Sequence, residues 1–196
     1  GNIKWVELKN PQTGQTLKYV PLPANWRVTP KSWESPNGST PMVYPGKKLG
    51  GHVQSIDQVI QQHILPLIQQ KGGRVDRTVD LPGITRTDQQ EMNGYKYIGG
   101  ARPAMAAKGL EPTENSTGEK GLMIIHFMRL SSNYGTVCKY WFHLMGTKGS
   151  AAGHEKDKQA VIYALSNFKM NAQAVAAHNS QTNNMLAQKD AAFQRN

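Results

Sequence analysis

Two apolar, β-prone runs at residues 122–130 and 136–145 limit the folds open to this chain more than any other feature. The segment between them, "SSNYG", is short and polar, so the two runs are predicted to form a β-hairpin. Apolar side chains occupy both faces of each run, which is the pattern of strands buried on both sides. We therefore expect an α+β fold in which a mainly antiparallel β-sheet is covered by helices on both faces.

The same hairpin carries the only cysteine of the chain between two histidines. If the turn occupies the last four residues of "SSNYG", His126 lies opposite Trp141 with His143 on the same face, while Cys138 faces Arg129 on the other side. A register shifted by one residue would pair Cys138 with His126 and remove His143 from that face. A buried cysteine in a central strand is usually inert, so a structural role is the favoured interpretation. A hydrolase that uses Cys138 with His126 or His143 is the alternative.

Few other residues point to catalysis or to a cofactor. A single cysteine excludes an internal disulfide and any metal site built from several cysteines. The hairpin has no carboxylate beside its histidines, and no GxSxG, HExxH or EF-hand motif occurs. The acidic residues, Asp88 among them, are isolated in the sequence, and most fall on segments that we expect to be exposed. We therefore expect neither a metal nor a cofactor.

The clearest helix spans residues 55–71, where apolar residues recur at helical spacing and Ser55 and Gln58 have the spacing of a capping box. Pro66 lies inside this helix and predicts a kink. A second helix is expected at about residues 156–168. An Ala-rich segment follows, so we divide the chain into an α+β domain at 1–170 and a C-terminal helical tail at 171–196.

The remaining segments are predicted from local patterns. Residues 3–8 and 16–20 form a hairpin in which Trp5 and Tyr19 pair, and prolines 21 and 23 end its second strand. The alternation in 74–81 predicts a half-exposed strand. We also expect a strand at 92–100 and a loop at 109–121, a segment that is rich in Gly and Glu and contains Pro112.

Two glycine-containing segments carry candidate ligand-binding residues. "GTKGSAAGHEKD" places Lys148 and Ser150 between a strand and a helix, where backbone N–H groups can bind a phosphate. Acidic residues at the start of the helix oppose an anion there, so a plain turn is favoured. "YIGGARPAMAAKG" places Arg102 and Lys108 among small residues as a second candidate, although a strand followed by a loop is the simpler interpretation.

The net charge of +10 favours an anionic partner, either a macromolecule or a surface. The basic residues are scattered and form no run of five, which disfavours nucleic acid. No window of 18 apolar residues occurs, so no transmembrane segment is expected. Gly1 is typical of a residue left after tag removal, and we expect the precursor to carry an export signal or a lipoprotein leader.

The order of these elements resembles the PsbP-like family over residues 3–170. The resemblance comprises a first hairpin that leads into Pro23-Ala-Asn-Trp26, the amphipathic helix from Ser55 to Lys71, the two long strands, and a closing helix that ends in "ALSNFKM". It implies an antiparallel sheet covered by helices and a non-enzymatic binding or assembly factor, often an exported one. None of the matched positions is a binding motif, so the resemblance assigns no site residues.

The combined expectation is a non-catalytic binding or assembly protein that acts in the periplasm or elsewhere outside the cytoplasm, either lipid-anchored as a precursor or free. The first alternative is the hydrolase described above. The second is a protein that binds nucleic acid or a small anionic ligand through its basic residues.

Overall fold

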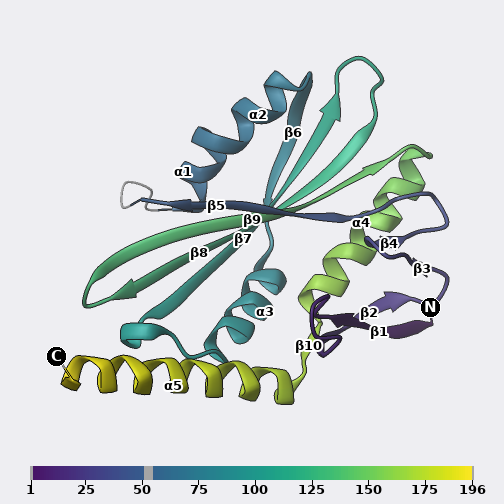
Figure 1. Cartoon of the computed structure of the whole chain (residues 1–196). Coiled ribbons are helices and arrows are strands. Elements are labelled where there is room, and N and C mark those ends of the chain that lie inside the picture. The colour runs from purple at the N-terminus through teal and green to yellow at the C-terminus, as the bar shows by residue number, and fades with distance from the viewer. Residues whose placement is uncertain (1, 51–54, 196) are drawn as a thin grey trace.

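The computed structural model describes residues 2–50 and 55–195, and side chains within α5 are described except those of 186, 187 and 189–195. Gly1, on which the expectation about tag removal rests, lies outside this range. The central element is an antiparallel five-stranded sheet with the strand order β5–β9–β8–β7–β6 (Figure 1). Its strands are β5 (Met42–Leu49), β6 (Gly73–Asp80), β7 (Arg102–Glu114), β8 (Lys120–Ser132) and β9 (Gly135–Thr147).

Helices cover both faces of this sheet, which confirms the predicted α+β fold (Figure 1). One face packs against a helix made of α1 (Ile56–Val59), the π-helical segment η1 (Ile60–Ile64) and α2 (Leu65–Gln70). The other face packs against α3 (Pro82–Asn93), α4 (Ala151–Ser166) and a small sheet of β1 (Ile3–Lys9), β2 (Thr16–Pro23) and β10 (Lys169–Met170). A two-stranded ribbon, β3 (Arg27–Val28) and β4 (Trp33–Glu34), lies beside the small sheet.

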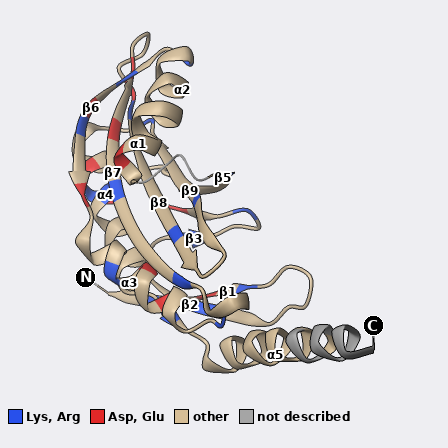
Figure 2. Cartoon of the chain, turned by 90° about the vertical axis from the view of Figure 1, so that its left-hand side faces the viewer, with Lys and Arg blue, Asp and Glu red and all other residues tan. Residues whose placement is uncertain are grey.

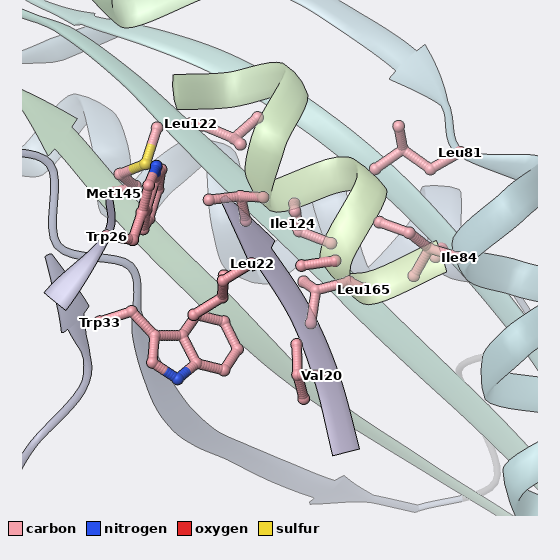
Figure 3. Packing of buried hydrophobic residues seen from close by; sticks show 13 residues of the cluster. Val20, Leu22, Trp26, Trp33, Leu81, Ile84, Leu122, Ile124, Met145 and Leu165 are labelled. Atoms are coloured by element: carbon pink, nitrogen blue, oxygen red, sulfur yellow. The ribbon is translucent and has the colours of Figure 1, made fainter. Parts of the chain in front are cut away.

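Each face of the sheet has its own hydrophobic core. The core between the large sheet and α4 contains Trp26 and Trp33, which are 3% and 6% exposed, together with Val20 and Leu22 of β2 (Figure 3). Trp26, which follows the prolines at the end of β2, therefore folds back onto the core. The second core lies under the helix from α1 to α2 and includes Cys138. Since β8 and β9 supply side chains to both cores, the hairpin predicted from the sequence is the centre of the fold.

The predicted helix at 55–71 is present, but it accommodates its proline without a sharp break. The Ser55 hydroxyl accepts a hydrogen bond from the Gln58 backbone N–H at 3.3 Å, as the capping pattern predicts. Pro66 cannot donate a backbone hydrogen bond, and the wider π turn of η1 directly precedes the turn that contains it.

The prediction of a loop at 109–121 was wrong. Strand β7 continues to Glu114 and β8 begins at Lys120, so only the turn between them is irregular. Pro112 is tolerated within a central strand because it lies beside a β-bulge in β6, where the register shifts between Val75 and Arg77. The composition of the segment predicted a loop, but the pairing of β7 with two neighbouring strands overrides it.

Helix α3 was missed, and the strand predicted at 92–100 is absent. Pro82 occupies the first turn of α3, where a proline is favoured, and the helix ends before Gly94. Its inward face includes Thr87, Asp88 and Glu91, so the apolar periodicity that identifies a helix is weak. Residues 95–100 form a loop with a short 3₁₀ turn, η2 (Ile98–Gly100).

Two further boundaries differ from the prediction. Helix α4 begins at Ala151, five residues earlier than expected, because the Ser150 hydroxyl caps it by accepting from the Gly153 backbone N–H at 3.0 Å. In the first hairpin, Trp5 lies opposite Pro21 rather than Tyr19, and β2 continues to residue 23. These prolines fit in β2 because β10 pairs only with the earlier part of that strand.

The C-terminal helix α5 (Ala172–Arg195) packs against the loop that follows α3. The Asn179 side chain bridges this loop twice, since its Oδ1 accepts from the Lys96 backbone N–H at 2.8 Å and its Nδ2 donates to the Gly94 carbonyl at 3.0 Å. His178 packs edge-on against Tyr95 with ring centroids 4.9 Å apart. Among the described residues, none of the helices combines the length and apolarity needed to cross a membrane.

Candidate functional sites

A buried row of three side chains links α3 to the central hairpin. The Nδ1 atom of His126 lies 2.6 Å from Oδ2 of Asp88, and its Nε2 atom lies 2.9 Å from Nδ1 of His143. Asp88 and His126 are only 3% and 2% exposed. We call Asp88, His126 and His143 the His126 relay. Trp141 stacks on the His126 ring with centroids 5.4 Å apart and thereby fixes its plane.

The hydrogen bonds of the relay limit where its protons can be. An ionised Asp88 only accepts, so His126 donates to it through Nδ1–H. When His126 is neutral, its Nε2 accepts from Nδ1–H of His143, and Nε2 of His143 is then unprotonated. When His126 is a cation, it donates from both nitrogens, and the proton of His143 moves to Nε2.

His143 borders a cavity of about 350 Å³, the His143 cavity, which lies among β1, the β3–β4 ribbon and the start of β5. Burial, and the positive charges of His126 and Lys18, lower the pKa of His143 to about 3, so this imidazole is neutral near pH 7. Among the described residues no buried side-chain nitrogen lacks a hydrogen-bond partner. Nε2 of His143 makes no hydrogen bond in that part of the chain, so this atom is not fully buried, and the cavity is the hollow that the His143 side chain borders.

The register of the hairpin decides which predicted site residues meet. His126 pairs with Trp141 and Arg129 pairs with Cys138, as in the first of the two predicted registers. His126 and His143 therefore lie together, whereas Cys138 packs in the core on the opposite face. The Cys–His pair of the hydrolase alternative is not formed.

Asp88 is the site residue that sequence reasoning missed. It was taken as isolated because α3 was not recognised, yet α3 brings it under the sheet beside His126. Pro82, followed by Arg, Gln, Glu and Met residues with good helical tendency around Asp88, was the available signal. A metal does not fit the relay. Both ring nitrogens of His126 and Nδ1 of His143 are already hydrogen-bonded, which leaves Nε2 of His143 as the one imidazole nitrogen of the relay that could bind a metal.

The four predicted ligand-binding residues do not converge. Lys148 and Ser150 border one hollow of about 360 Å³ at the start of α4, where the Ser150 hydroxyl already serves as the helix cap. Arg102 and Lys108 lie in strand β7 rather than in a loop, and they border two different hollows. Lys108 is also paired with Asp57, at 2.6 Å.

A second hollow of ligand size is mainly apolar. It measures about 460 Å³ and lies between α2 and the large sheet, where all five strands of that sheet contribute to its lining. We call it the α2 groove. Its walls include two aromatic rings that stack with centroids 5.3 Å apart, and its main apolar residues are Tyr44, Leu67, Ile68, Met123, Phe142 and Leu144.

The charged residues are distributed in mixed clusters. Figure 2 shows basic and acidic segments interspersed along β6 and β7. Arg74 and Lys120 both contact Asp76 at 3.1 Å, and Arg77 contacts Glu111 at 2.7 Å. The pairing of acids with bases on these strands makes this part of the surface unlike a uniformly basic patch.

Comparison with known proteins gives no relative: no family model, no curated protein and no solved structure matches this chain.

Proposed function

We propose that this is a non-catalytic binding protein that holds an amphipathic ligand, an apolar chain with an acidic head group, in the α2 groove. The observation that carries the proposal is the apolar lining of a groove of about 460 Å³. Sites for small ligands are usually pre-formed hollows of this size, lined by apolar and aromatic side chains with a few polar groups at the mouth.

The mouth of the groove supports an acidic head group. Lys71 and Lys120 border it, as do two glutamates. Lys120 is held by Asp76 and Thr113, at 3.1 and 3.0 Å. Lys71 makes no ion pair in the described part of the chain, and its ammonium group is therefore available to a ligand carboxylate. The net charge of +10 adds a general attraction for anions.

Titration calorimetry with dodecanoate tests this function. Tyr44→Ala removes an aromatic contact and is expected to weaken binding roughly tenfold, and Lys71→Gln is expected to weaken it a few-fold. Tyr163→Ala and Lys156→Gln are matched controls, because both residues lie on the exposed side of α4 away from the groove. Absence of dodecanoate binding, or equal effects of site and control variants, would refute the proposal.

Action outside the cytoplasm, as the PsbP-like resemblance implies, is part of this proposal. Fractionation of cells that express the full-length protein tests it, and recovery with the cytoplasmic markers would contradict it.

A further inference from the structure

We propose that the His143 cavity is a second binding site, for a small carboxylate with an apolar body, and that the ligand draws one proton into the His126 relay as it binds. This site lies on the opposite face of the large sheet from the α2 groove and does not depend on the function proposed for that groove.

The cavity provides donors for an anion and an apolar wall for the rest of the ligand. Lys9 and Lys31 border it, and of these only Lys9 has a carboxylate partner in the described residues, Glu7 at 3.7 Å. The hydroxyls of Thr29 and Ser32 already donate to backbone carbonyls. The apolar part of the lining is formed by Leu8, Val28, Trp33 and Val43.

The loop beside the cavity is held in place before any ligand arrives. Asp157 of α4 is 2% exposed and accepts hydrogen bonds from the hydroxyls of Ser35 and Ser39, both at 2.6 Å. These bonds fix the segment that carries Pro41 into the cavity wall. A pre-formed wall lowers the entropic cost of binding.

The relay supplies the last donor when it takes up a proton. With His126 neutral, Nε2 of His143 is a hydrogen-bond acceptor, which repels a carboxylate oxygen. Protonation of His126 makes Nε2 of His143 a donor, which favours the carboxylate. The ligand therefore favours the protonated relay, and linkage requires that it take up a proton when it binds.

The charges that surround the relay allow this proton to enter. Asp88 is the anion in contact with His126, and no carboxylate other than Asp88 contacts either histidine among the described residues. Glu91, on the same helix, is already paired with Lys18 of β2 at 2.5 Å. The positive charge of Lys18 opposes protonation of the pair. The cavity lining adds the charges of Glu7, Lys9 and Lys31, and Lys139 lies over the ring of Trp141. Asp88 therefore compensates the new charge.

Titration calorimetry with benzoate, in two buffers of different ionisation enthalpy at about pH 8, tests the proposal. We expect benzoate to bind, with an uptake approaching one proton, and its affinity to fall roughly tenfold per pH unit as the pH rises. Inorganic phosphate is the second probe. Equal affinity for phosphate would mean that the cavity recognises charge alone and would contradict a site for a carboxylate with an apolar body.

Three variants separate the cavity from the relay. His143→Gln is expected to lower benzoate affinity at least tenfold, whereas His178→Gln, on α5, leaves it unchanged. Asp88→Asn is expected to abolish the proton uptake, so that the binding enthalpies measured in the two buffers become equal. Unchanged affinity in His143→Gln, or an uptake of zero in the wild-type protein, would overturn the proposal.

A measurement on the wild-type protein guards against variants that do not fold. The ¹⁵N shifts of the His143 ring are expected to show an unprotonated Nε2 at about pH 8 without ligand and a protonated Nε2 with benzoate. A ring that keeps the same tautomer while benzoate is bound would also overturn the proposal.

Discussion

Cys138 and His143 belong to the same strand, yet their side chains have different surroundings because alternate residues of a strand point to opposite faces. His143 reaches a cavity, whereas Cys138 is 1% exposed under the helix from α1 to α2. Burial raises the pKa of the Cys138 thiol, and the nearby positive charge of Arg129 lowers it by a smaller amount. The thiol is therefore protonated near pH 7, which is a poor state for a nucleophile.

We expect Cys138 to react with a disulfide reagent such as 5,5′-dithiobis(2-nitrobenzoate) only when the protein unfolds. The native protein should show no fast phase, and one equivalent should react in denaturant. Tyr134→Cys is a suitable control, since Tyr134 is 90% exposed in the turn of the hairpin and its replacement should react at once. Fast labelling of the native wild-type thiol would contradict the buried placement.

Helices and strands were predictable from the sequence where burial of apolar side chains alone determines the element. The hairpin of β8 and β9 was predicted because both of its runs are apolar on both faces, and its register is the first of the two that the sequence left open. Helix α3 and the end of β7 were not predicted, because α3 turns polar residues inward and β7 contains Gly109 and Pro112. The relay depends on both kinds of element, so its histidine pair was predictable and Asp88 was not.

The register of β5 against β9 shifts between Pro45 and Lys48, and this bulge in β5 can be tested by mutation. A Cβ atom on Gly46 would lie 1.8 Å from the backbone carbonyl oxygen of Tyr140, which cannot move without displacing β9. We expect Gly46→Ala to lower the free energy of unfolding by about 2–4 kcal/mol, as measured by urea denaturation. Gly50→Ala is the matched control, because its added methyl group would meet no atom within 4 Å, and it should change stability by less than about 1 kcal/mol. Equal urea midpoints for Gly46→Ala and Gly50→Ala would contradict the close approach of Gly46 to the Tyr140 carbonyl.

For the whole molecule, both cores share the central hairpin, so neither can be lost alone. We expect residues 1–170 to unfold as one cooperative unit. Tryptophan fluorescence, which reports on the four tryptophans including the buried Trp26 and Trp33, and exposure of the Cys138 thiol should give the same urea midpoint. Two separate midpoints would show that the faces of the sheet unfold independently and that the predicted single domain is wrong.

Strand β5 separates the two proposed sites. Its adjacent residues Tyr44 and Val43 border the α2 groove and the His143 cavity, respectively. Among the described residues it lies at the edge of the large sheet and pairs with β9 alone. An edge strand that is hydrogen-bonded along one side and borders two hollows cannot be displaced from one of them without changing the shape of the other. We therefore expect a ligand in either site to alter the shape of the other, even though no side chain borders both.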